Sequence, residues 1–283
     1  MVRFDFPDII NEIVDSLKYD VHTLYDLSLV NRSWCTLVIP RLWANPFSYT
    51  SNAGGRSAEA LVKVYLSCLP SYQKRSISKL IDIPERKVSI FNYPSYLKIL
   101  PLDSITDTLS YVKNPGSDMK RIYVALLKLI LQTSFGLKEA RLFEEIPAEV
   151  IRYTDLPNSI RSISISTRIP SAKALVFISR QVHLEELLIT STTITKIECM
   201  TDDILKHKNT LKTLSICLAI LPTENYHIIF SIASQMRRLE KLMIRAFFGI
   251  TDWQMKQLSE GLKESMIYKS HTELSMTFIA RGN

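Results

Sequence analysis

The sequence is poor in glycine and in long apolar runs, and both shortages exclude whole classes of protein. It has seven glycines among 283 residues, and it contains neither a P-loop nor a GxGxxG pattern. A Gly-rich loop that cradles phosphate is therefore excluded. No segment approaches the roughly 18 unbroken apolar residues that a membrane helix needs, so we expect no membrane partner.

Cysteine and histidine are also sparse. The four cysteines are scattered without a CxxC pair, and the five histidines form no HExxH pattern and no paired metal spacing. We therefore expect reduced, mostly buried thiols, with no metal and no cofactor. We expect Cys217 to be an inert buried thiol and His183 to be a strand-edge or core histidine. The first residues are acidic and aromatic, which does not fit a secretory signal, so we expect a cytoplasmic or nuclear protein.

No catalytic pattern is present. The nucleophile-elbow pattern GxSxG is absent. Glu144-Glu145 and Glu185-Glu186 are pairs of acids, but adjacent residues on a strand point to opposite faces. We interpret both pairs as surface charges and expect that the chain is not itself an enzyme.

The charge is unevenly distributed. The composition, 46% hydrophobic and 22% charged, is that of a globular protein. Residues 1–50 carry four basic and six acidic side chains, whereas the whole chain has a net charge of +7, so the remainder carries +9. A basic body attracts acidic partners or nucleic acid. Because its Lys and Arg residues are dispersed, we do not expect direct nucleic-acid binding.

The first 47 residues carry two apolar stripes with helical spacing. Pro7 suits the first turn of a helix, and Asp8 suits its positive end. The first stripe consists of Ile10, Ile13, Val14 and Leu17, and the second, after the start signal Asp20, of Leu24, Leu27, Val30, Trp34 and Leu37. Two short helices do not make an independent core, so a partner surface would complete them.

The order of these residues resembles an F-box, the helical module that docks a substrate receptor on a Skp adaptor and through it on a cullin–RING scaffold. The resemblance rests on Phe6-Pro7, the Ile and Leu pairs, and the run Val30-Asn31-Arg32-Ser33-Trp34, and it covers about a sixth of the chain. It implies that the adaptor-binding residues are Phe6, Pro7, Ile10, Ile13, Leu17, Leu24, Leu27, Val30 and Trp34. Some of these residues must instead hold the module together, and Trp43 either anchors the adaptor or seals the module against the following helix. The alternative is an ordinary helical hairpin packed on the rest of the protein.

Beyond residue 136 the sequence repeats an apolar-x-x-apolar-x-apolar signature. Five copies start 23, 24, 27 and 28 residues apart, at Leu137, Ile160, Leu184, Leu211 and Leu239, and a sixth is suggested at His271-Leu274-Met276. Each copy suits a strand with one buried face. The stretches between them, Ser171 to Val182, Asn225 to Met236 and Asp252 to Ser265, have helical spacing.

This period resembles a leucine-rich repeat, in which every unit supplies one strand and one return helix. The family's Asn or Cys after the third apolar position is absent, because Glu145, Arg168, Thr192, Ala219 and Phe247 stand there. The resemblance therefore implies an irregular solenoid, and the alternative is an unrelated α/β domain. We predict an α/β protein with an F-box at 1–50, a helical linker or cap at 51–135, and a leucine-rich-repeat-like solenoid at 136–283.

Together the two resemblances imply the substrate receptor of a Skp–cullin–F-box ubiquitin ligase, which would hold an unknown target protein on its repeats. An adaptor-bound scaffold without ligase function and a basic repeat protein that binds nucleic acid are the alternatives. The physical candidate for target binding is the solvent-facing side of the strands. Its mixed side chains indicate no target class: Glu186, Leu188, Thr213, Ser215, Lys241 and Met243.

Overall fold

The computed structural model describes residues 7–17, 20–49, 55–84, 90–112, 118–143, 146–153, 157–166, 172–191, 198–220, 223–248 and 273–278. The chain divides into two compact units. The first comprises residues 1–100 and 104–136, and the second comprises residues 101–103 and 137–283. Within the described ranges, no helix combines the length and the apolar character needed to cross a membrane.

The first unit begins with three short helices, α1 (Pro7–Ser16), α2 (Val21–Val30) and α3 (Arg32–Leu42). The apolar stripe from Leu24 to Leu37 predicts one continuous helix, and this prediction is wrong. The stripe is broken at Asn31, whose backbone is extended (φ −165°, ψ 176°). The Asn31 side chain accepts a hydrogen bond of 3.0 Å from the backbone N–H of Trp34. Asn31 therefore ends α2 and caps α3.

The remainder of the first unit is also largely helical. Its described elements are α5 (Gly55–Leu66), α6 (Ser71–Ile77), the 3₁₀ turn η1 (Tyr93–Tyr96) and α8 (Met119–Thr133). It also holds most of β1 (Ile99–Pro101) and α7 (Leu102–Ser110), of which residues 101–103 belong to the second unit. The apolar spacing of Ile122, Leu126, Leu129 and Ile130 predicts a helix over Met119–Phe135, and α8 confirms it. The sequence from Phe91 through Leu97 to Leu100 predicts a further helical stretch. This prediction is wrong, because a single turn with Pro94 near its start leads into β1. The polar, glycine-bearing stretch from Ser51 to Arg56 predicts a linker, but Gly55 and Arg56 begin α5.

The second unit alternates strands and helices along the chain. The strands are β2 (Glu139–Leu142), β3 (Ser162–Ser166), β4 (Glu186–Ser191), β5 (Thr213–Ile220), β6 (Lys241–Phe248) and β7 (Glu273–Phe278). The intervening helices are α9 (Ala148–Tyr153), α10 (Ala172–Ser179), α11 (Glu198–Leu205) and α12 (Thr223–Gln235). The six strands pair in parallel and in chain order. The prediction of an α/β fold is thus confirmed.

The apolar signature places the same side chains at the same height in successive strands. One ladder in the register consists of Ala140, Ile163, Leu187, Leu214, Leu242 and Leu274, and the next of Leu142, Ile165, Ile189, Ile216, Ile244 and Met276. From β2 to β6 every member of these ladders is buried. The starts of the five copies, from Leu137 to Leu239, are buried as well. The period therefore builds one continuous core, because each strand buries the face that its neighbours bury.

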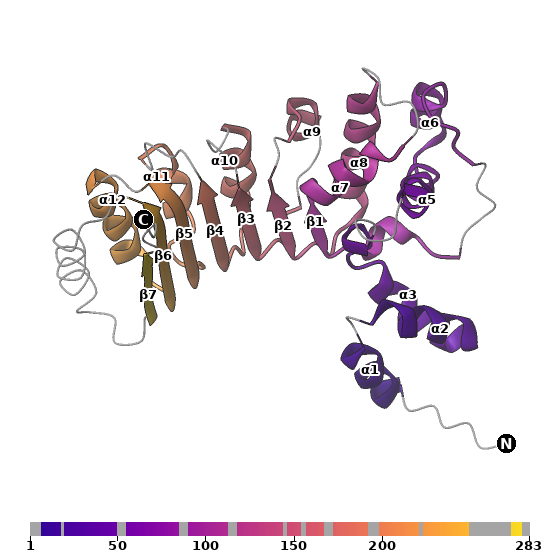
Figure 1. Cartoon of the computed structure of the whole chain (residues 1–283), viewed down its shortest axis with the longest axis horizontal. Coiled ribbons are helices and arrows are strands. Elements are labelled where there is room, and N and C mark those ends of the chain that lie inside the picture. Colours follow the sequence, from indigo (N-terminus) through magenta and orange to yellow (C-terminus); the bar gives the residue numbers. More distant parts are fainter. Residues whose placement is uncertain are drawn as a thin grey trace, which may run out of the picture. The chain divides into compact units, whose positions relative to one another are not determined.

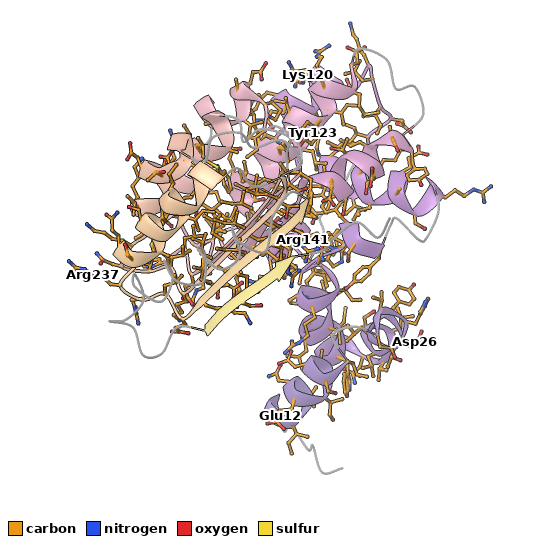
Figure 2. The ribbon with its side chains drawn as sticks, turned by 60° about the vertical axis from the view of Figure 1, so that its left-hand side comes forward. Glu12, Asp26, Lys120, Tyr123, Arg141 and Arg237 are labelled. Atoms are coloured by element: carbon orange, nitrogen blue, oxygen red, sulfur yellow. The ribbon has the colours of Figure 1, made fainter. Side chains whose placement is uncertain are left out.

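The helices lie along one side of these strands in Figure 1, and side chains fill the layer between them in Figure 2. The other face of the sheet is not covered by any described helix. It carries the alternate strand residues, which are exposed or half-buried in β2, β3 and β4. The predicted helix over Asp252–Ser265 and the positions Glu145, Arg168 and Thr192 lie outside the described residues. Ala219 and Phe247 lie within β5 and β6, so at these two positions the strand continues past the expected turn.

Candidate protein-docking surfaces

The three N-terminal helices share a small core of their own. Val14, Leu24 and Val38, one from each helix, are buried together. Five partly buried side chains pack against them: Ile10, Leu17, Leu27, Trp34 and Leu42. The start of α2 is fixed by Asp20, which accepts hydrogen bonds from the Thr23 N–H at 3.0 Å and the Thr23 hydroxyl at 2.7 Å. These bonds lower the pKa of Asp20 below its usual range, so the cap is charged at neutral pH.

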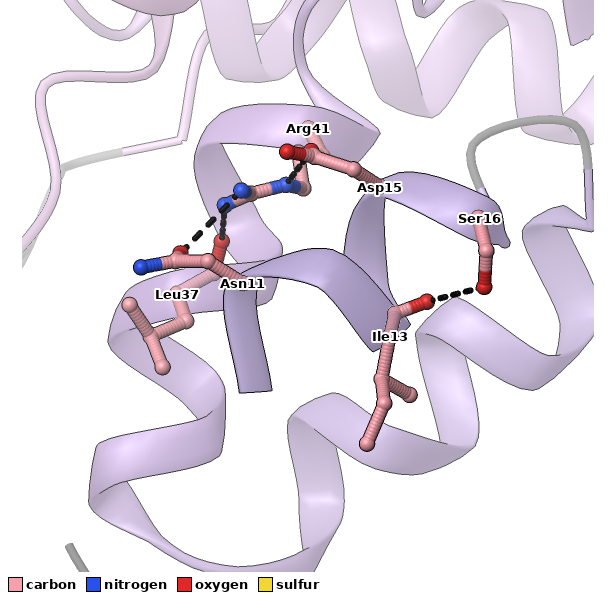
Figure 3. Close-up of polar contacts among 6 residues, drawn as sticks. All are labelled: Asn11, Ile13, Asp15, Ser16, Leu37 and Arg41. Carbon is pink, nitrogen blue, oxygen red and sulfur yellow. Dashed lines mark hydrogen bonds and ion pairs between the residues drawn. The ribbon is translucent and has the colours of Figure 1, made fainter. Parts of the chain in front are cut away.

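A cluster of polar contacts around Arg41 joins α1 to α3 (Figure 3). The Arg41 Nε lies 2.6 Å from Asp15 Oδ1, and its Nη2 donates to Asn11 Oδ1 at 3.1 Å. Its Nη1 donates to the Leu37 carbonyl at 2.8 Å. Only the planar guanidinium, with several donors in a fixed fork, makes all three bonds at once. Arg41 therefore holds α1 in a defined orientation on α3.

The apolar arc of α1 is wider than the part that the core covers. With 3.6 residues per turn, the arc runs from Ile9 through Ile13, Leu17 and Ile10 to Val14 and spans about 140°. The Val14 edge is buried, whereas Ile9 and Ile13 at the opposite edge are 52% and 43% exposed. These two residues lie four positions apart, so they form a short apolar stripe on the surface of α1.

The surface of α2 carries a second apolar stripe. Leu24 and Ser28 face the core, while Tyr25, Leu29 and Val30 are 58%, 67% and 60% exposed. Tyr25 and Leu29 lie four residues apart and share one side of the helix. A helix that is apolar on most sides is normally buried, but α2 packs mainly on α3 among the described elements, and its Leu24 meets Val14 of α1 in the small core. We refer to Ile9, Ile13, Tyr25, Leu29 and Val30 together as the N-terminal apolar surface.

The structure separates the residues that the F-box resemblance implied for adaptor binding. Leu24 is a core residue, and Ile10, Leu17, Leu27 and Trp34 pack partly against that core. Ile13 and Val30 are exposed. Phe6 lies outside the described residues. Pro7 begins α1, as predicted, but its side chain is not described.

Sequence reasoning missed Ile9, Tyr25 and Leu29. The spacing of apolar residues identifies the apolar side of a helix. It does not show which part of that side a neighbouring helix covers. The available signal was that α2 holds apolar residues on nearly every side. More apolar surface than one neighbour can bury indicates a docking surface.

Trp43 belongs to an aromatic cluster in the body of the first unit. It caps α3, stacks on Tyr93 with ring centroids 4.2 Å apart, and lies 5.7 Å from the ring of Tyr65. Phe47 contacts the same Tyr65 ring, with centroids 5.2 Å apart. Of the two roles left open for Trp43, the structure favours the one in which it seals α3 against the helix that follows.

The uncovered face of the sheet forms a second candidate surface. A hollow of about 480 Å³ lies over β2 to β6. Its lining includes Glu186, Leu188, Thr213, Ser215 and Met243, all expected on the solvent-facing side of the strands. The hollow also contains Arg141 and Glu139 from β2; Figure 2 labels Arg141.

Two histidines of the second unit, His183 and His207, lie in different surroundings. His183 is exposed, not a core histidine, because it lies in the bend before β4. His207 is buried, and its Nε2 lies 3.1 Å from the Ile178 carbonyl. Burial lowers the pKa of His207 and raises the pKa of the half-buried Cys217 thiol. Among the described residues, no group of His, Cys, Asp and Glu side chains is arranged to hold a metal ion.

We expect mostly buried thiols, but Cys35, Cys68 and Cys217 are only half-buried.

Comparison of the chain with family models, with curated proteins and with solved structures finds no match.

Proposed function

We propose that this protein is the substrate receptor of a Skp–cullin–F-box ubiquitin ligase, acting in the cytoplasm or nucleus. In this proposal α1 to α3 form the F-box and dock on a Skp-family adaptor, which links the chain to a cullin–RING scaffold. The second unit, as an irregular leucine-rich-repeat-like solenoid, holds the target protein. The chain itself is non-catalytic, and ubiquitin transfer comes from its partners by proximity.

The observation that carries the proposal is the N-terminal apolar surface. Five large apolar side chains are between 43% and 67% exposed on α1 and α2, although the three helices have a small core of their own. Exposed apolar side chains that lie close together mark sites of protein association, because monomeric soluble proteins rarely expose large apolar patches. The acidic residues Glu12, Asp15 and Asp26 are exposed on the same helices and supply a polar rim.

The polar contacts of the module support a docking role as well. Arg41, Asp20 and Asn31 fix the ends and the packing of the three helices through side-chain hydrogen bonds. A module that is rigid before binding has less conformational entropy to lose when a partner binds. The apolar side chains that project from it therefore contribute more of their burial energy to affinity.

The test is capture of the full chain by a co-expressed Skp adaptor in a pull-down assay. The informative variant is Ile13→Gln combined with Leu29→Gln, because both side chains are exposed and neither belongs to the module core. We expect capture to fall by at least about tenfold, which is the usual effect of losing central apolar contacts. The matched control is Val176→Gln combined with Val182→Gln, two exposed apolar positions of the second unit.

The control variant should bind the adaptor like the wild type, and both variants should keep the wild-type melting temperature. The proposal is wrong if the folded wild type captures no adaptor. It is also wrong if the Ile13 and Leu29 variant is captured as well as the wild type. A ubiquitylation assay with the reconstituted ligase distinguishes a receptor from an adaptor-bound scaffold. A receptor supports the transfer of ubiquitin to its bound target, and a scaffold does not.

A further inference from the structure

The hollow on the uncovered face has a specific pattern of side chains. Where β2 to β6 lie in register, one row across the strands reads Glu139, Ser162, Glu186, Thr213 and Lys241. The next row reads Arg141, Ser164, Leu188, Ser215 and Met243. Large side chains therefore alternate with small hydroxyl-bearing ones along the second row. The hollow exists because the serines of β3 and β5 leave space between their larger neighbours.

The charges in the hollow do not cancel. Glu139 and Arg141 neutralise each other, since the Arg141 Nε lies 2.6 Å from Glu139 Oε1. Glu186 and Asp103 also line the hollow, and neither makes an ion pair with any described residue. The Oδ1 of Asp103 is buried without a hydrogen-bond partner. Two carboxylates are thus left without a cationic partner in the part of the hollow that the structure describes.

This acidic character is local. Residues 137–283 contain 19 Lys and Arg residues against 16 Asp and Glu residues, so the sequence of the repeat region is basic. An excess of carboxylates in one hollow of a basic region indicates a cationic ligand of small size. A long basic tract would be repelled by the positive charge of the surrounding region.

Ser215 provides an independent sign of a ligand. It is 4% exposed and lines the hollow between Leu188 and Met243, its register neighbours on β4 and β6. Its hydroxyl makes no hydrogen bond with any described residue. A ligand group that reached this hydroxyl would therefore bind with less competition from the protein's own polar groups.

We propose that the hollow binds an extended segment of the target protein that carries a single Lys or Arg. The cationic group of that residue pairs with Glu186, while Asp103, which follows β1 and lies about three strand spacings from β4, adds negative charge to the same hollow. A neighbouring small or aliphatic residue packs on Leu188 and Met243, and the Ser215 hydroxyl bonds to the main chain of the segment. That the bound segment belongs to a target protein rests on the proposed receptor function, but binding of the segment is measured without the adaptor.

The test uses pools of short synthetic peptides with randomised flanks and a fixed central residue: Lys, Arg, norleucine or Glu. Binding of each pool to the full-length chain is measured by fluorescence anisotropy at low and at high salt. We expect the Lys and Arg pools to bind about tenfold more tightly than the norleucine and Glu pools at low salt. The preference should shrink at high salt, where exposed charges are screened.

Two variants connect the preference to the hollow. Glu186→Gln combined with Asp103→Asn should abolish the preference for Lys and Arg over norleucine. Ser164→Leu, which fills the space between Arg141 and Leu188 without changing charge, should weaken binding of all pools. The control, Glu240→Gln, removes an exposed carboxylate that does not line the hollow, and it should preserve the preference.

The inference is overturned if the norleucine or Glu pools bind as tightly as the Lys and Arg pools. It is also overturned if Glu240→Gln reduces the preference as much as the hollow variants do. Adaptor capture is measured on the same proteins and should be unchanged by all of them. Peptide selectivity without adaptor capture would contradict the proposed receptor function but support the peptide site in the hollow. Adaptor capture without peptide selectivity would support the receptor function and contradict the peptide site.

Discussion

Lys212 is joined to Glu185, the equivalent residue of the preceding repeat, through both its main chain and its side chain. The Lys212 N–H donates to the Glu185 carbonyl at 2.7 Å, and the Lys212 Nζ donates to Glu185 Oε2 at 2.9 Å. Arg161, one repeat further back, lies 3.5 Å from the other carboxylate oxygen and repeats the main-chain contact with Glu185. The residues that precede β3, β4 and β5 thus form a ladder of alternating charge.

We expect Glu185→Gln to lower the melting temperature slightly at pH 7. The hydrogen bond from Lys212, supported by the charges of Lys212 and Arg161, lowers the pKa of Glu185. A lowered carboxyl pKa stabilises the fold above the unfolded-state pKa and loses this effect as the pH falls through the folded-state pKa. The difference from the wild type should therefore be present above the ordinary glutamate pKa of about 4.3 and shrink as the pH falls below it. It should also shrink in about 1 M salt. A difference that is the same at every pH would contradict this account; Glu240→Gln is the control.

We expect Leu214→Ala to destabilise the protein by about 2–5 kcal/mol, because the residue is fully buried in the ladder between Leu187 and Leu242. Leu188→Ala, on the uncovered face of the neighbouring strand, should cost less than about 1 kcal/mol. Urea titration followed by circular dichroism measures both values. Equal losses for the two variants would show that the face carrying Leu188 is covered in solution.

We expect Arg41→Lys to loosen α1, even though it keeps the positive charge. Lysine cannot contact Asp15, Asn11 and the Leu37 carbonyl together, so we expect a loss of about 1 kcal/mol in the packing of α1 on α3. Hydrogen–deuterium exchange should become faster in residues 7–16 and remain unchanged in residues 213–220, which belong to the other unit. Unchanged exchange in α1 would exclude this role for Arg41.

We expect the protein to lose stability as the pH falls from 7.5 to 5.5, partly because of His207. Burial is the main cause that lowers the pKa of His207 in the folded state. The unfolded chain therefore binds the proton first, and stability is present above the ordinary histidine pKa of about 6.5 and is lost below it. The variant His207→Gln should respond less to this pH change in denaturant titrations. Equal responses would assign the pH dependence to other groups.

Much of the second unit could be predicted from the sequence. The apolar signature fixes strand position, and its equal phase in each copy fixes the register, because a slip by one residue would turn every buried side chain outward. The paired ladders through Ala140 and Leu142 follow directly from it. The polar residues of this unit were harder to place. His183 and His207 both lie outside strands, and only their contacts with neighbouring repeats decide which of them is buried.

The N-terminal helices show a different limit. An apolar stripe continues through Asn31 with helical spacing, so spacing alone predicts one helix where there are two. The break is caused by the Asn31 side chain, which accepts a hydrogen bond from the backbone N–H three residues further on. Such a local hydrogen bond competes with the helix, and the spacing of apolar residues does not reveal it. Likewise, the sequence identifies the apolar arc of α1 but not that Val14 is its buried edge, since this depends on the positions of Leu24 and Val38.

The strands of the second unit lengthen from four residues in β2 to six in β4 and eight in β5 and β6. At about 3.3 Å per residue, the uncovered face widens from about 13 Å at β2 to about 26 Å at β5 and β6, and the six residues of β7 span about 20 Å. The two ends of this face therefore differ in breadth as well as in side chains. A segment lying across the strands would meet different surroundings if it were turned end for end, which gives the face a means of selecting the direction of a bound chain.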